Sequence, residues 1–562
     1  MTLRILFTLL LSATCALAFS QEYSLGMEWN PALTAKASTK IQLASVSYRG
    51  MPASYSLEKY APSVGNQGDY GTCNAFACAY AAATMIFAQT HGITDKTTID
   101  KLVFSPTYLY QNIVTNGGNN CQSGTHPVPA LIFMNEKGLP FNKTVPYTCG
   151  KSWSSTADLE AEKYKISDAA LLFGKDNEVL DADFKVESTK KALLENTPVI
   201  IGFELPKSFF KVKTDTWDPD PAEALGNWQH GKHAMTVVAY DDYKAGGAFK
   251  LLNSWGSGWG SGGYVWVKYA DYTRCCLMAF QPFGDANAPL PDFIAEVAPQ
   301  PAPRPKVLPK REEVVDVEPK PQPKVEPKPT PQPKVEPKPQ PKPEPKKEVV
   351  IKPEPKPQPK PTPQYDPTFT LKGSVEFKQN TGETMTANRI SSRNLIVEDE
   401  DKSNNKPQSE DLAAYRMDKS YPSGTKFRFF ININEQAYIY AFATDLTGQV
   451  NRIMPYDDLI STHVGANSVV AFPSEKKVVK MDENKGTDYM LILYSTEKLD
   501  SKAIAEKMSA TKGGLSQKIK TALGDKLVDK GDVKYSEKEI GFDFTSKKRG
   551  GIVPLMIEIS HE

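Results

Sequence analysis

The chain has few cysteines, almost no net charge and no long apolar run after its first twenty residues. Its 562 residues include 7 cysteines, and none lies in the last half of the chain. Such a count excludes a dense disulfide scaffold and leaves room for one reactive thiol and one or two bridges. A formal net charge of +1 gives no argument for a nucleic-acid partner. Beyond the N-terminus no stretch reaches the ~18 apolar residues that a membrane-spanning helix needs, so we expect no membrane span.

The first twenty residues have the pattern of a secretory signal peptide. Arg4 precedes an apolar run at residues 5–11, and small residues follow. We interpret residues 1–20 as a cleaved signal, which predicts a secreted, periplasmic or cell-envelope protein in a compartment that permits disulfides. A lipoprotein signal that ends at Cys15 is the alternative.

Composition divides the rest of the chain into four parts. Residues 21–50 form a short leader without a helical repeat long enough to fold alone. Residues 51–284 form a compact domain, and residues 367–562 form a second folded unit. Between them, in residues 285–366, proline at nearly alternate positions disfavours helix and sheet and favours a polyproline II linker. A proline-rich docking ligand is the alternative for this linker.

The domain of residues 51–284 is helical in its first half and β-rich in its second half. This order predicts an α+β, two-lobed fold. The expected helices follow Cys73 and lie at 105–114 and 186–196, and the expected strands lie at 198–203, 234–240, 249–253 and 263–268.

The second folded unit is predicted to be a β-rich accessory domain, a small sandwich with appended helices. We expect strands at 427–433, 437–442 and 489–494, a hairpin turn at 445–448, and helices at 502–508 and 515–527. The unit has no cysteine and only two histidines, His463 and His561. We therefore expect a binding or scaffold module, with a protein or cell-envelope ligand, rather than a second site of chemistry.

One cysteine has the setting of a nucleophile. The glycine-containing loop 66–72, which includes Gln67, delivers Cys73 to the start of an apolar helical pattern. A thiol in the first helical turn feels the positive end of the helix dipole, which favours the thiolate. His233 enters an apolar strand and supplies a base, and Asn253 further along supplies an orienting amide. Cysteine, histidine and asparagine complete the logic of a nucleophilic triad.

These motifs resemble those of the papain-like cysteine peptidases. The matching stretches are Asn66-Gln67-Gly68, Gly71-Thr72-Cys73, His233-Ala234 and the run from Asn253 to Gly260. The resemblance covers residues 51–284 and implies a helical left lobe, a β-barrel-like right lobe and an active cleft between them. It implies a cysteine endopeptidase that acts on protein or peptide substrates and needs no metal and no cofactor. In this resemblance Cys73 attacks the peptide carbonyl, His233 holds the proton and Asn253 orients the imidazole.

The resemblance also assigns supporting roles. Gln67 would donate its side-chain amide to the oxyanion hole, and Trp255 would shield the histidine–asparagine hydrogen bond. Gly124 would pair with the backbone of the substrate. Trp259 would line the leaving-group side, and Ala234 would also border the substrate.

Two cysteines depart from the family pattern. Tyr70 stands where the family has the usual partner of Cys121, and the usual partner of Cys149 is missing too. The resemblance therefore implies that Cys121 and Cys149 bridge each other, with two free thiols as the alternative.

The leader also departs from the family, because a papain-like zymogen usually carries a long helical prosegment. We hypothesise that this chain lacks such inhibition or uses a short peptide within residues 22–49. The C-terminal unit loosely resembles a bacterial domain of unknown function on 437–442, 448–450 and 453–455. That match implies a bacterial envelope protein whose peptidase is tethered to a recognition module. Two competing readings are an inactive papain-fold scaffold that binds peptides and a transpeptidase.

Overall fold

The structure is a computed structural model, and the part of the chain that it describes falls into nine segments. They are residues 23–41, 51–115, 120–174, 181–227, 229–295, 368–390, 414–445, 449–474 and 477–562. The predicted signal peptide and residues 446–448 of the predicted hairpin turn lie outside these segments, as does most of the predicted linker. The described residues before and after the proline-rich segment belong to one compact unit.

A helical run from Cys73 to Thr90 forms the centre of the first lobe. It consists of α3 (Cys73–Ala75), a π-helical segment at Phe76–Ala83 and α4 (Thr84–Thr90). Nearly every side chain of the run is buried, and many of them are alanines, which let neighbouring helices approach closely. The predicted helix at 105–114 is α6 (Pro106–Ile113), whose Ser105 cap accepts a hydrogen bond from the Tyr108 amide.

The remaining helices of this domain are short. They are α1 (Pro31–Thr34), α5 (Lys96–Lys101), α7 (Pro127–Glu136), α8 (Ser155–Ala161), α9 (Ala182–Leu194), α10 (Lys207–Phe210), α11 (Tyr269–Cys275) and α12 (Asp292–Ala295). The predicted helix at 186–196 begins earlier, at Ala182, because Asp181 caps its first turn. The leader is not purely extended, since Asn30 caps α1 and Pro31 occupies its first turn.

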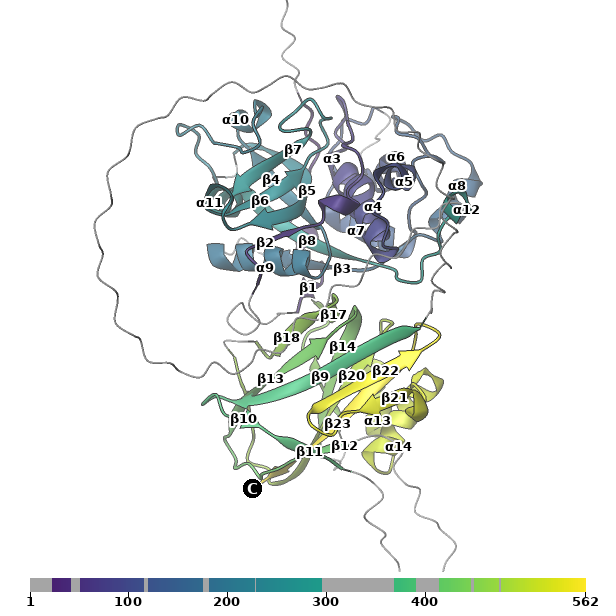
Figure 1. The fold of residues 1–562 in the computed structure, drawn as a ribbon, viewed down its shortest axis with the longest axis vertical. Helices are drawn as coiled ribbons and strands as arrows, with labels where there is room; N and C mark the ends of the chain where they lie inside the picture. Colours follow the sequence, from purple (N-terminus) through teal and green to yellow (C-terminus); the bar gives the residue numbers. More distant parts are fainter. Residues whose placement is uncertain are drawn as a thin grey trace, which may run out of the picture. The chain divides into compact units, whose positions relative to one another are not determined.

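A mostly antiparallel sheet forms the second lobe. Its strand order includes β3 (Ile166–Phe173), β8 (Cys276–Gly284), β4 (Val199–Leu205), β5 (Gly231–Asp241), β6 (Ala248–Leu252) and β7 (Tyr264–Lys268). Figure 1 shows β4, β5, β6 and β7 side by side. The strands predicted from the sequence lie here, and a short strand, β2 (Ser54–Ser56), pairs with β5. The α+β class predicted for this domain is therefore confirmed.

The first domain extends past its predicted end at residue 284. Ala288 and Ile294 are buried in its core, and the Phe293 ring contacts the Phe141 ring. These apolar side chains, with helix α12, keep residues 285–295 on the domain, where the sequence predicted linker.

The C-terminal unit is a sandwich of two sheets. One sheet holds β9 (Phe369–Gln379), β10 (Thr384–Met385), β13 (Lys426–Ile433), β18 (Ser468–Phe472), β19 (Val479–Lys480), β21 (Val533–Tyr535) and β22 (Ile540–Ser546). The other holds β11 (Ala387–Ile390), β12 (Ala414–Met417), β14 (Ala437–Thr444), β15 (Asn451–Met454), β17 (His463–Val464), β20 (Gly486–Ser495) and β23 (Ile552–His561). Apolar residues from both sheets form its core.

Two helices, α13 (Ser501–Ala510) and α14 (Leu515–Leu523), cover an outer apolar face of the second sheet. Helix α14 ends before the predicted residue 527 because Gly524 takes a positive φ of 53° and a 3₁₀ turn follows.

Two short strands at the edge of the first domain's sheet come from outside that domain. They are β1 (Thr39–Lys40) of the leader, which pairs with β3, and β16 (Ile460–Ser461) of the C-terminal unit, which pairs with β1. Within the described residues, no helix has both the length and the apolar composition to cross a membrane.

Candidate active site

The thiol of Cys73 lies where the helical lobe meets the sheet. Cys73 is the first residue of α3 and its side chain is fully buried. The backbone amide of Ala234, in β5, donates a hydrogen bond to Sγ over 3.4 Å. This contact brings a helix start and a strand entry from distant parts of the chain to one point.

His233 precedes Ala234 in β5 and is also fully buried. Its Nε2 lies 2.7 Å from Oδ1 of Asn253, which also accepts a hydrogen bond from the Ser254 amide over 2.7 Å. Because the carboxamide oxygen can only accept, Nε2 carries the proton and Nδ1 is left as the basic nitrogen. Within the part of the chain that the structure describes, Nδ1 has no hydrogen-bond partner.

Two tryptophans support this pair differently. The Trp255 ring lies 4.7 Å from the His233 ring, centroid to centroid, and so covers the histidine. Trp259 lies behind Trp255, with ring centroids 5.2 Å apart, and its Nε1 donates to the carbonyl of Phe209. Trp259 has an exposed fraction of 1%, and its ring packs against the Phe209 ring with centroids 5.2 Å apart. Its predicted place on the leaving-group side stays a prediction.

Gln67 has a fixed side chain next to the thiol. Its Oε1 accepts a hydrogen bond from Oγ of Ser254 over 2.6 Å, so its Nε2 points away as a donor. Nε2 donates to the carbonyl of Tyr70 over 2.8 Å and to the carbonyl of Ser24 over 3.1 Å. A donor held in this way suits an oxyanion hole, because no reorganisation is needed when charge develops.

A disulfide joins Cys121 to Cys149. The carbonyl of Cys121 accepts a hydrogen bond from the Gly71 amide over 2.7 Å, which ties the disulfide to the loop before the nucleophile. Gly124 lies near this bridge, in a segment that faces the leader.

The leader occupies the cleft over these residues. The Tyr23 ring stacks on Trp255 with centroids 4.5 Å apart, and the Ser24 carbonyl also accepts from Nε1 of Trp255 over 3.3 Å. The Ser24 carbonyl therefore takes two donors of the site, those of Gln67 and Trp255. The sequence predicted a short peptide in this role as one of two hypotheses.

Gly26 is the leader residue against the thiol. Its backbone amide acts on the Cys73 thiol, lowering the pKa of that thiol against the larger raising effect of burial. Its carbonyl is turned elsewhere and accepts a hydrogen bond from the Thr125 amide over 3.0 Å. A Cβ on Gly26 would lie only 2.0 Å from the carbonyl oxygen of Gly71, so glycine is required by this close approach.

Residues on either side of Gly26 fill the walls of the cleft. Met27 is buried and forms a parallel bridge with Thr125, and its thioether lies against Gly202 of β4. The Glu28 amide donates to the Thr125 carbonyl over 3.0 Å. Backbone pairing with the leader therefore goes through Thr125, the residue after the predicted Gly124. The sequence offered no separate signal for Thr125 beyond its adjacency to Gly124.

Burial keeps both Cys73 and His233 uncharged. It raises the pKa of the Cys73 thiol from 9.0 to about 12, although backbone amides partly oppose the shift. It lowers the pKa of His233 from 6.5 to about 4, although the hydrogen bond to Asn253 partly opposes that shift. The state described here is therefore a thiol beside a neutral imidazole.

Two family models match the chain. The model described as papain family cysteine protease matches residues 52–283, and a domain of unknown function, DUF4384, matches residues 420–498. Cathepsin J of Mus musculus is 28% identical over 228 residues, which are 40% of this chain and 61% of that protein. A cysteine protease of Blomia tropicalis is 23% identical over 226 residues, 39% of this chain and 62% of that protein.

Among solved structures, xylellain, a cysteine protease from Xylella fastidiosa, is 20% identical with a TM-score of 0.37. The match covers 47% of this chain and 96% of that one. The chain thus spans about three fifths of the length of the two curated relatives named above.

Proposed function

We propose that the chain is an exported cysteine endopeptidase, folded in a latent form, and the match of residues 52–283 to the papain family cysteine protease model supports this. The proposed catalytic residues are Cys73, His233, Asn253 and Gln67. The observation that carries the proposal is the contact of the Cys73 thiol with the strand that contains His233. The hydrogen bond from Nε2 of His233 to Asn253 fixes the imidazole, and Nδ1 has no hydrogen-bond partner among the described residues.

In the proposed reaction, Nδ1 of His233 takes the thiol proton and Sγ of Cys73 adds to a peptide carbonyl. The oxyanion accepts hydrogen bonds from Nε2 of Gln67 and from the Cys73 amide. Collapse of the tetrahedral adduct breaks the C–N bond, and the imidazolium gives its proton to the leaving amine. Water, deprotonated by His233, then hydrolyses the thioester and restores the thiol.

This reaction requires the leader to leave. The Ser24 carbonyl accepts a hydrogen bond from Nε2 of Gln67, and the Gly26 amide acts on the Cys73 thiol. While they do so, no substrate carbonyl can reach Sγ. We propose that leader displacement also lets the thiol and the imidazole form an ion pair, because both groups regain contact with water.

Export and tethering complete the proposal. The signal-like residues 1–20 support a secreted or cell-envelope location, and the proline-rich stretch supports a spacer. The match of residues 420–498 to DUF4384 supports a separate accessory module, whose ligand we expect to be a protein or a cell-envelope component.

The test compares the wild-type chain with Cys73→Ala and with a variant from which residues 21–29 are deleted, so that Lys40 keeps its pairing with Glu195. We expect an epoxide probe to label Cys73, faster after leader deletion, and a peptide library to be cleaved by every form except Cys73→Ala. Absence of labelling in the leader-deleted chain would favour the inactive scaffold. Products that carry an added amine in place of water would favour the transpeptidase.

A further inference from the structure

The far end of the leader lies between the catalytic domain and the C-terminal unit. Strand β1 contacts β3 of the catalytic domain through the pair Thr39–Leu171. On its other edge it pairs with β16 of the C-terminal unit through two residues, Thr39 with Ile460 and Lys40 with Ser461. The C-terminal unit thus extends a sheet of the catalytic domain, and the leader is the strand that joins them.

Strand β1 and the residue that follows it donate backbone hydrogen bonds to the C-terminal unit. The Thr39 amide donates to the Leu459 carbonyl over 2.6 Å, and the Ile41 amide donates to the Ser461 carbonyl over 3.3 Å. The Ile41 side chain is buried in the apolar core of the sandwich. From the catalytic domain, the Leu171 amide donates to the Ser38 carbonyl over 2.8 Å.

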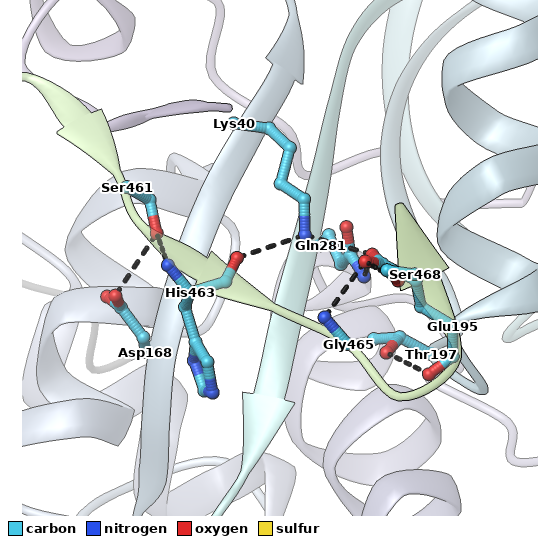
Figure 2. A network of polar contacts seen from close by, with 9 residues as sticks. All are labelled: Lys40, Asp168, Glu195, Thr197, Gln281, Ser461, His463, Gly465 and Ser468. Atoms are coloured by element: carbon cyan, nitrogen blue, oxygen red, sulfur yellow. Dashed lines mark hydrogen bonds and ion pairs between the residues drawn. The ribbon is translucent and has the colours of Figure 1, made fainter. Parts of the chain in front are cut away.

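A buried polar network fixes Lys40 at the same place (Figure 2). The Lys40 ammonium lies 2.9 Å from a carboxylate oxygen of Glu195, and both side chains are at least nine-tenths buried. It also donates to the His463 carbonyl over 3.1 Å. Breaking a buried ion pair by removing one partner is strongly destabilising, because it leaves the other charge unpaired.

Glu195 collects donors from both sides of this junction. From the C-terminal unit it accepts hydrogen bonds from the Gly465 amide over 2.8 Å and from Oγ of Ser468 over 2.5 Å. From β8 it accepts one from Nε2 of Gln281 over 2.5 Å. The carboxylate therefore links the leader, the catalytic domain and the C-terminal unit in one network.

Further contacts join the two domains directly beside this network. Oγ of Ser461 donates to a carboxylate oxygen of Asp168 over 3.2 Å, and the Tyr438 hydroxyl donates to the Ser167 carbonyl over 3.1 Å. Detaching the C-terminal unit therefore breaks contacts to the leader and to β3 together.

We propose that the C-terminal unit has a leader-binding surface, made of residues 459–461, His463, Gly465 and Ser468, that holds β1 and so keeps the leader in the cleft. The occupant of this surface is the leader segment Thr39–Ile41 of the same chain. The inference rests on the proposed function, in that leader release is what exposes Cys73. A ligand that displaces β1 from this surface would activate the peptidase.

Gly465 offers a specific way to separate the surfaces. A Cβ at this position would lie 2.3 Å from Cβ of Glu195, and no positive φ requires glycine there. Alanine at position 465 therefore suits the backbone conformation of the sandwich, and its Cβ clashes with Glu195 at the junction with the catalytic domain. Gly531→Ala is the matched control, since a Cβ there meets nothing within 4 Å. Ser468→Ala removes one hydrogen bond to Glu195 without a clash and serves as a milder variant.

The experiment measures hydrogen exchange in peptides covering residues 23–41 and 459–472 of the full chain, and the rate at which an epoxide labels Cys73. We expect Gly465→Ala to raise both the exchange of the leader and the labelling rate about tenfold, the factor that one or two lost hydrogen bonds produce. Ser468→Ala should raise them less, and Gly531→Ala should leave them unchanged.

Three outcomes distinguish the proposed leader-binding surface from the proposed peptidase activity. Faster exchange at 459–472 with an unchanged leader and unchanged labelling would overturn the proposal. So would unchanged exchange at both segments, because a methyl group cannot enter beside Glu195 without displacing it. A leader that opens and a Cys73 that is labelled, without any cleavage of peptides, would support the leader-binding surface and refute the peptidase.

Discussion

Replacing Gly26 with alanine should expel the leader from the cleft and make the Cys73 thiol reactive. The added Cβ would lie 2.0 Å from the Gly71 carbonyl oxygen and 2.1 Å from the carbonyl carbon. Both are backbone atoms of the loop before the nucleophile, so no side-chain rotation relieves the overlap. Gly26 has no positive φ that would itself exclude alanine, so the effect isolates this close approach.

The magnitude follows from the pKa of the thiol. Burial raises the Cys73 pKa from 9.0 to about 12, so its return to the ordinary value would raise the thiolate fraction near neutral pH by about 10³. A less basic thiolate is a weaker nucleophile, with a Brønsted coefficient of about 0.5, which reduces the gain to about 30-fold. This factor corresponds to full exposure of the thiol, and easier access of the reagent adds to it, so we expect an increase on the order of 30-fold.

The assay is the rate of alkylation of Cys73 by iodoacetamide between pH 5 and pH 9, read by mass spectrometry of the peptide that contains it. Gly531→Ala is the control, because the same substitution there meets open space. If Gly26→Ala increases hydrogen exchange in residues 23–29 but leaves the alkylation rate and its pH profile unchanged, the leader does not control the thiol and the reasoning fails.

Other predictions test the pH response, the oxyanion donor and the disulfide. Burial lowers the pKa of His233 from 6.5 to about 4 in the covered state, so that state keeps its full stability above pH 6.5 and loses it as the pH falls toward 4. Leader opening should therefore be about 30-fold more favourable at pH 5 than at pH 7.5. Equal rates of Cys73 labelling at the two pH values, after correction for the thiolate fraction, would contradict this. Gln67→Ala in the leader-deleted chain should lower kcat by about 10²–10³ with little change in KM, since Nε2 acts on the developing oxyanion; a change confined to KM would exclude that role. Replacing Cys121 and Cys149 by serine should lower the free energy of unfolding by about 3.5 kcal/mol for a sequence separation of 28 residues, measured by urea denaturation against wild type with the disulfide intact, and an unchanged midpoint would contradict it.

The proposed catalytic residues could be predicted from the sequence because each one lies in a recognisable local pattern. A loop before an apolar helical repeat put Cys73 at a helix start, and an apolar strand after His233 put the histidine at a strand entry. The role of Gln67 came from resemblance, since no local rule predicts that its side chain accepts a hydrogen bond from Ser254 and donates to Tyr70. The position of Trp259 next to Trp255 could not be predicted from local pattern, because it depends on contacts with Phe209.

The position of the leader could not be read from its residues. Gly26 is required by the distance to the Gly71 backbone, a relation between segments that the chain separates. The strand β1 is two residues long and gives no period to recognise, yet it pairs with Ile460 and Ser461 far along the sequence. Burial, which only the folded chain defines, then shifts the pKa values of Cys73 and His233 in opposite directions.

By itself the sequence determined the α+β class of the first domain, and it predicted the order of the domains, a proline-rich spacer and the proposed nucleophile, base and orienting amide. Those features follow from local composition, periodicity and motif. The tertiary structure decided that the leader covers the thiol and that the C-terminal unit holds the leader's far end. It decided them because backbone hydrogen bonds, the Lys40–Glu195 pair and close packing form only between segments that folding brings together.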